Sequence, residues 1–165
     1  MTERFQRSIE STSELIAPWL ENATFEGLTI AQKAARIEFT NYSQDEGSPR
    51  PRQIVLSFFL PGWLGDWQEW ECTVSNLAKE HSLDGTTCSW AHLAAQLVSL
   101  RQTSIKRAWL EGNAQLNLEF ESGAIIHIPS VSSPRFTDTW KLMASFAAPQ
   151  TIDTVVADSD GTCRY

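Results

Sequence analysis

Apolar and polar residues alternate most regularly between positions 115 and 128, and this alternation predicts a β-hairpin with one buried face. A three-residue loop at 121–123, with Gly123 in a left-handed conformation, places Leu118 opposite Ile126. A two-residue loop would place Leu118 opposite His127 and mix the two faces of the sheet. The three-residue register is therefore predicted, and its buried face consists of Leu116, Leu118, Phe120, Ala124, Ile126 and Ile128.

Five other segments carry the pattern of β-strands. Residues 53–60 are almost wholly apolar, which favours a central position in a sheet. Residues 70–75 alternate, which predicts a strand with Trp70, Cys72 and Val74 facing inward. The polar segment 41–52 holds one glycine and two prolines, so it is predicted to be a loop. The remaining strands are expected at residues 35–40, 105–110 and 139–143.

Two segments show helical spacing instead. Residues 90–101 repeat apolar side chains at intervals of three and four, which predicts an amphipathic helix capped by Ser89. Residues 3–20 predict an N-terminal helix, weakened near its end by Pro18. The buried stripe of the 90–101 helix would consist of Trp90, Leu93, Ala94, Leu97 and Val98.

These elements predict an α+β fold in which an antiparallel meander sheet packs against an N-terminal helix and one central amphipathic helix. A length of 165 residues fits one domain, expected here at residues 1–149. Beyond that point the composition becomes small and polar. Residues 150–165 are therefore expected to form a loosely held C-terminal tail.

The formal net charge of −7 restricts the kinds of partner that this protein is expected to bind. It argues against direct binding of nucleic acid, which requires clustered lysine and arginine. It favours a basic protein partner, or simply solubility. The chain also holds no nucleophile elbow and no glycine-rich phosphate loop, so neither an enzyme nor a cofactor is expected.

The ends and apolar runs of the chain predict its location. The first ten residues lack the apolar core of a secretory signal. The most apolar run, residues 54–64, is too short to span a bilayer. A cytoplasmic protein without membrane contact is therefore expected, and its three cysteines suit reduced thiols.

One set of residues resembles metal ligands: Cys72, His81, Cys88 and His92. Cys88 and His92 are four positions apart and would share one helical face. Structural zinc sites, however, usually contain tight pairs such as C-x₂₋₄-C, and Cys72 lies far from Cys88 in the sequence. We therefore expect no metal site, and we expect these cysteines to act as small core residues.

Residues 61–71 concentrate three tryptophans and three carboxylates in one short segment. Tryptophan is enriched at the energetic centres of protein interfaces, and carboxylates beside it would select a basic partner. Gly62 and Gly65 favour a turn at the surface. Burial of these rings in a core is the alternative interpretation. The candidate partner-binding residues are Trp63, Asp66, Trp67, Glu69 and Glu71.

A second hypothesis concerns His127. In the predicted register it lies on the polar side of the hairpin, opposite Asn117 and near Glu119. Such an arrangement is typical of an acid–base pair, and equally of a cross-strand hydrogen bond. The alternative function is therefore a small-molecule-binding or enzymatic α+β domain that uses His127 and neighbouring polar groups.

Four patterns follow one another between residues 70 and 142: Trp70-x-Cys72-x-Val74, the helix with Trp90 and Leu93, the hairpin 116–128 and Trp140-x-Leu142. Their order resembles that of small bacterial domain families, some uncharacterised and others immunity proteins that neutralise a cognate toxin. The resemblance implies a non-enzymatic cytosolic protein that occludes the active site of a toxin. It transfers no functional residue to this chain.

Overall fold

The computed structural model describes residues 6–31, 34–42, 48–59, 61–130, 138–147, 150–158 and 163–164. The described helices are α1 (Ile9–Leu20), α2 (Trp67–His81) and α3 (Gly85–Ser99). The described strands are β1 (Gln6–Arg7), β2 (Thr24–Ala31), β3 (Ala34–Thr40), β4 (Gln53–Phe58), β5 (Trp63–Leu64), β6 (Ile105–Glu111), β7 (Gln115–Phe120), β8 (Ile125–Ile128), β9 (Asp138–Ser145), β10 (Ile152–Asp158) and β11 (Cys163–Arg164).

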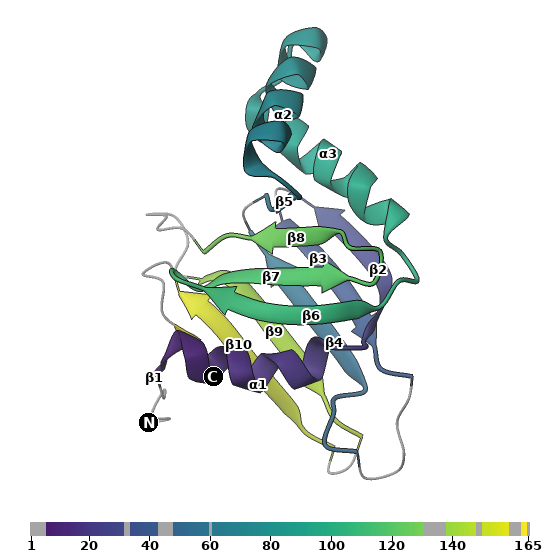
Figure 1. Ribbon diagram of the computed structural model, residues 1–165, viewed down its shortest axis with the longest axis vertical. Helices are drawn as coiled ribbons and strands as arrows, with labels where there is room; N and C mark the ends of the chain where they lie inside the picture. Colours follow the sequence, from purple (N-terminus) through teal and green to yellow (C-terminus); the bar gives the residue numbers. More distant parts are fainter. Residues whose placement is uncertain are drawn as a thin grey trace.

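The strands form two antiparallel sheets. The larger has seven strands in the order β1-β11-β10-β9-β4-β3-β2, and the smaller has four in the order β5-β8-β7-β6. In Figure 1 the smaller sheet lies in front of the larger one, α1 runs along the β6 side, and α2 and α3 lie above the opposite edge. The α+β class with antiparallel strands is confirmed, although the strands divide into two sheets rather than one meander.

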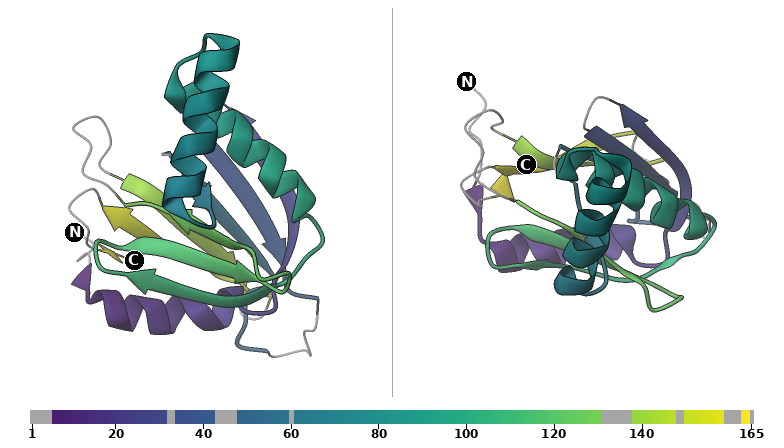
Figure 2. Two further views of the ribbon diagram at one scale, coloured as in Figure 1. Left: turned by 45° about the horizontal axis from the view of Figure 1, so that its top comes forward. Right: turned by 90° about the horizontal axis from the view of Figure 1, so that it is seen from above.

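The core lies between the facing sides of the two sheets, which the turned views of Figure 2 show as separate layers. Phe25 of the larger sheet contacts Phe39 beside it and Phe120 of the smaller sheet, with ring centroids 5.9 and 6.4 Å apart. Trp140 is fully buried and donates a hydrogen bond of 2.8 Å from Nε1 to the carbonyl of Ala114. Aromatic packing and this buried bond therefore hold the sheets together.

The hairpin register predicted from the alternation is confirmed. Leu118 pairs with Ile126, and the amide of Phe120 donates to the carbonyl of Ala124 at 2.8 Å. Gly123 has a φ of +84°, the left-handed conformation that a three-residue loop requires. The predicted central position of the strand after residue 52 is confirmed as well, because β4 lies between β3 and β9.

Helix α1 begins later than the pattern predicts. The side chain of Ser8 accepts a hydrogen bond from the amide of Ser11, which caps a helix starting at Ile9. Residues 6 and 7 form strand β1 instead, and the predicted helical positions 3–5 lie outside the described residues. Ile16 and Leu20 are fully buried, and Ser13 Oγ accepts from the amide of Leu110 on β6.

The strand predicted at residues 70–75 is wrong, because this segment belongs to helix α2. Asp66 caps the helix, and the apolar contacts come from Trp70 and Val74, one turn apart. Cys72, predicted to face inward, is exposed. Residues four apart share a face in a helix and also in a strand, so Trp70 and Val74 satisfied both patterns.

Helix α3 is present where an amphipathic helix was predicted, but its N-cap is Asp84 rather than Ser89. Asp84 accepts a hydrogen bond of 2.9 Å from the amide of Thr87. Of the predicted stripe, Trp90, Leu93 and Leu97 are buried, while Val98 is 60% exposed. Trp90 stacks on Phe58 of β4 at 5.8 Å, which connects α3 to the larger sheet.

The C-terminal segment is not the loosely held polar tail that its composition predicts. Residues 152–158 form β10, which pairs along its length with β9. Val155 and Ala157 are buried, and Thr139 Oγ1 donates to the carbonyl of Ala157 at 3.2 Å. Small apolar residues at alternate positions are enough to cover one face of a sheet. The average composition of the segment is polar, and it therefore gave no sign of this strand.

The burial of α3 generates a stability prediction at two adjacent positions. Leu97 is fully buried and Val98 is 60% exposed. We expect Leu97→Asn to lower the free energy of unfolding by about 3 kcal/mol, and Val98→Asn to change it by less than about 0.5 kcal/mol. Chemical denaturation of both variants measures the difference, and equal losses would contradict the observed orientation of α3.

Candidate functional site

The candidate site is built around strand β5, which joins the smaller sheet to the helical pair α2 and α3. Trp63 pairs with His127 and Leu64 with Ile126, so β5 forms the edge of the sheet next to β8. Gly62 makes this pairing possible. A Cβ at that position would lie 2.5 Å from the carbonyl oxygen of His127, so only glycine allows β5 to approach β8 this closely.

Three aromatic rings are stacked at this edge. Trp63 lies nearly parallel to the ring of His127, with centroids 5.1 Å apart and planes 19° apart. Trp67, the first residue of α2, packs its edge against Trp63 at 5.0 Å. Trp67 is 49% exposed, whereas Trp63 is half-buried. The partly exposed indole of Trp67 therefore packs on Trp63, which in turn packs on His127.

The carboxylates of the predicted partner-binding set take different positions around these rings. Asp66 caps α2, and its Oδ1 accepts from the amides of Gln68 and Glu69 at 2.8 and 3.0 Å. Glu69 and Glu71 are exposed on α2. Trp63, Asp66 and Trp67 are therefore brought together at the turn between β5 and α2, and the two glutamates lie along the helix that follows.

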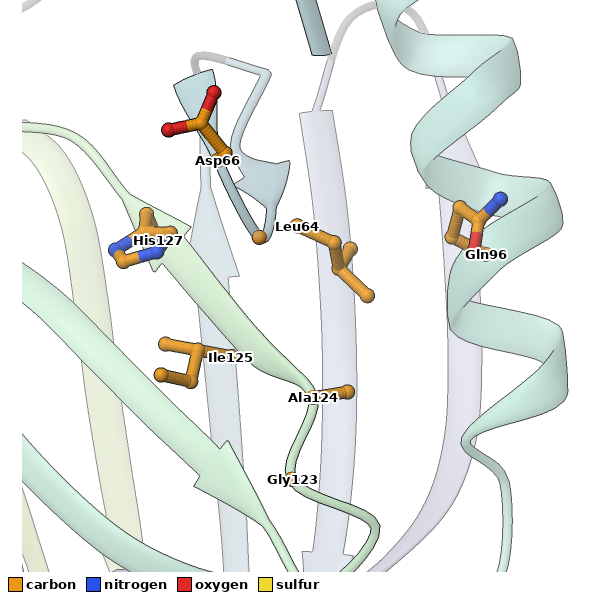
Figure 3. A pocket seen from close by; sticks show the side chains of 8 residues that line it. Leu64, Asp66, Gln96, Gly123, Ala124, Ile125 and His127 are labelled. Carbon is orange, nitrogen blue, oxygen red and sulfur yellow. The ribbon is translucent and has the colours of Figure 1, made fainter. Parts of the chain in front are cut away.

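An open cavity of about 420 Å³ lies beside this turn. In Figure 3, α3 with Gln96 forms one side, β8 with His127 forms the other, and Asp66 lies above them. The remaining lining comes from the β5–α2 turn and the β7–β8 hairpin: Leu64, Gly65, Gly123, Ala124 and Ile125.

A smaller cavity of about 190 Å³ adjoins the first and shares Leu64 and Gln96 with it. Glu69 contributes a carboxylate to this cavity, while Glu71 lines neither of the two. The other lining residues are Trp70, Thr73 and His92. His92 is half-buried against Trp70, with ring centroids 4.5 Å apart, so it is less open to solvent than its place on the polar face of the predicted helix implied.

The outer face of the smaller sheet carries a row of side chains that the sequence patterns did not identify as one unit. The strand registers place Trp63, His127, Asn117 and Trp109 side by side across β5, β8, β7 and β6. The position of Trp109 in this row was missed. A two-residue turn at 112–113 would place Trp109 opposite Leu116. The loop instead has three residues, 112–114, with Ala114 at a φ of +55°, and this register places Trp109 opposite Asn117.

His127 is held by its neighbours in this row. Its Nδ1 lies 2.6 Å from Oδ1 of Asn117, which also accepts from Nε2 of Gln115 at 2.9 Å. With this amide orientation, the neutral ring carries its hydrogen on Nδ1. Asn117 is fully buried, so this contact is the cross-strand hydrogen bond that was one of the two interpretations of the pair.

The surroundings of His127 also set its charge. Burial lowers the pKa of His127 below its ordinary value of 6.5, while the carboxylate of Glu111 and a backbone hydrogen-bonding interaction with Gly65 oppose this effect. The net lowering favours the neutral ring near pH 7. A neutral imidazole is a suitable flat support for the indole of Trp63.

The residues that resembled metal ligands are dispersed. Cys72 is exposed on α2, Cys88 is buried in α3, and His81 is exposed at the end of α2. Across the described ranges, no group of three or more histidine, cysteine, aspartate or glutamate side chains is arranged to hold a metal ion. In the same ranges, no helix has the length and apolar character that a membrane crossing requires.

Comparisons of the chain with protein-family models, with curated proteins and with solved structures found no match. The function of this site therefore has to be argued from its own geometry and charge.

The lowered pKa of His127 predicts a pH dependence of stability. Because the unfolded chain binds a proton at this residue more readily than the folded one, the free energy of unfolding decreases as the pH falls through 6.5 toward the folded-state pKa. Thermal melting between pH 8 and pH 5 should show this decrease. The His127→Gln variant should lack the His127 component of the decrease, and an identical pH profile in both proteins would contradict the assignment.

Proposed function

We propose that this protein is a non-enzymatic binding protein that engages a basic protein partner through the β5–α2 turn. By analogy with the immunity proteins that its sequence resembles, the partner would be a toxin whose active site the bound protein covers. The observation that carries the proposal is the exposed indole of Trp67, supported on Trp63 and His127 and bordered by carboxylates.

The aromatic arrangement supports binding rather than catalysis. Central interface residues are typically large aromatic side chains held rigid before the partner arrives, because little conformational entropy is then lost on binding. Trp67 meets this description, since its edge packs on Trp63 and nearly half of its surface stays exposed. The ring of His127 serves as a support in this arrangement, with Nδ1 engaged by Asn117.

The charge of the segment supports a basic partner. Residues 61–78 contain three carboxylates and no lysine or arginine, within a chain of net charge −7. All three carboxylates, those of Asp66, Glu69 and Glu71, belong to exposed residues at the start of α2. Such a surface attracts a positively charged cleft and repels nucleic acid.

Replacement of Trp67 tests the proposal directly. The binding assay uses the purified product of the gene adjacent to the one that encodes this chain. We expect Trp67→Ala to weaken binding by about 30-fold, because truncation of a central interface tryptophan commonly costs about 2 kcal/mol. Isothermal titration calorimetry measures the change, and circular dichroism verifies that the variant is folded.

The matched control is Tyr42→Ala, which removes a 70% exposed aromatic side chain from the segment after β3, away from α2. This variant should bind like the wild type. If the folded Trp67→Ala protein also binds like the wild type, the β5–α2 turn is not the interface and the proposal fails.

The carboxylates are expected to act on the rate of association. The double variant Glu69→Gln/Glu71→Gln should slow association by about fivefold at low salt and reduce its salt dependence, because charges at the rim of an interface mainly steer encounter. The dissociation rate should change little. Stopped-flow or surface plasmon resonance at two salt concentrations separates the rates, and a change confined to dissociation would contradict a steering role.

A second candidate function is the binding of a small molecule in the cavity that His127 lines. The supporting observation is the volume of about 420 Å³, within the range of small-ligand sites, with one ring nitrogen of His127 fixed by Asn117. A metabolite that raises the melting temperature of the wild type, but not of His127→Gln, would favour this function. A failure of partner binding together with that result would replace the first proposal.

A further inference from the structure

The two adjoining cavities form one groove between the helical pair and the edge of the smaller sheet. They share Leu64 and Gln96, and together they extend from the β7–β8 hairpin to the first two turns of α2 and the C-terminal half of α3. Among the described residues that line them, none is a lysine or an arginine. Asp66 in the larger cavity and Glu69 in the smaller one are the acidic side chains of the groove.

The larger cavity combines two kinds of surface. Leu64, Ala124 and Ile125 are half-buried and supply apolar contact, while Asp66, Gln96 and His127 supply polar atoms. An arginine side chain has the same division, with an apolar stem and a charged planar head. A carboxylate ligand would be repelled by Asp66 and Glu69, and a purely apolar ligand would offer no donor to Oδ2 of Asp66, which accepts no described hydrogen bond.

Asp66 is prepared for such a head group. Both hydrogen bonds that cap α2 are accepted by Oδ1, and Oδ2 has no donor among the described contacts. The cap holds the carboxylate in place, so the entropy cost of binding a cation to it is small. Gln96 adds a polar side chain on the opposite side of the cavity.

We infer that the groove receives an arginine side chain from an extended segment of the basic partner, with the guanidinium at Asp66 and the alkyl stem against Leu64 and Ile125. The inference rests on the proposed function for the identity of the partner. Trp67 would then provide the apolar centre of the interface, and the groove would provide selection for a basic residue beside it.

A peptide titration tests the groove without the partner. The ¹⁵N-labelled protein is titrated with acetyl-Ala-Arg-Ala-amide and, separately, with the same peptide carrying citrulline, which retains the stem and planar head but is uncharged. We expect saturable amide shifts at Gln96, Ala124 and His127, and binding of the citrulline peptide weaker by about fivefold. Free agmatine should bind more weakly than the arginine peptide, because it lacks the flanking backbone.

Two variants separate the local site from the overall charge. Asp66→Asn retains a side chain that caps helices well and removes the charge. It should therefore weaken the binding of the arginine peptide by about threefold without unfolding the protein. Glu80→Gln makes the same change in net charge on the same helix, outside both cavities, and should leave binding unchanged. A melting curve confirms that Asp66→Asn is folded.

Several outcomes would overturn the inference. They are equal binding of the citrulline peptide, shifts that map to another surface, equal losses in the two variants, or equal binding of agmatine, which would indicate a site for small amines. Failure here is distinct from failure of the proposed function. If the peptide does not bind while Trp67→Ala still weakens partner binding, the groove is not the arginine site and the β5–α2 interface remains.

Discussion

The position of the whole site depends on the approach of β5 to β8, where the ring of Trp63 lies on the ring of His127. This two-residue strand carries the chain from the sheets into the helical pair, and its closeness to β8 requires that Gly62 have no side chain. Asn117 fixes the ring of His127 from the other side. The buried amide of Asn117 thereby fixes the exposed indole of Trp67 in place, through the rings of His127 and Trp63.

The two helices of the pair are buried to different extents, and the less buried one, α2, leaves most of its surface exposed to solvent. Helix α3 is fixed to the larger sheet through the stack of Trp90 on Phe58. In α2, by contrast, Trp70 and Val74 are the buried side chains, so most of that helix faces solvent. A helix that contributes little to the core is free to carry charge. Its N-cap and first two turns bear the carboxylates on which both proposals depend.

Local pattern was sufficient where one physical constraint determined the outcome. The hairpin register followed from the alternation of residues 115–128, because a slip of one residue would have moved every apolar side chain to solvent. The pattern gave the wrong element where the same residue spacing fits both the helical and the strand periodicity. Trp70 and Val74 are four residues apart, which fits both a helix and a strand, and the capping bonds of Asp66 favour the helix. At β10, a polar average concealed buried Val155 and Ala157.

For the candidate site, the sequence by itself identified the candidate residues: tryptophans and carboxylates concentrated in residues 61–71, and a histidine predicted to lie opposite Asn117. Only the tertiary structure decided how they combine. Trp63 meets His127 through a pairing between residues far apart in the chain, and Gln96 reaches the same cavity from α3. Periodicity reports which face of its own element a residue occupies. It cannot report which distant strand or helix that face will meet, because that choice depends on the packing of the whole core.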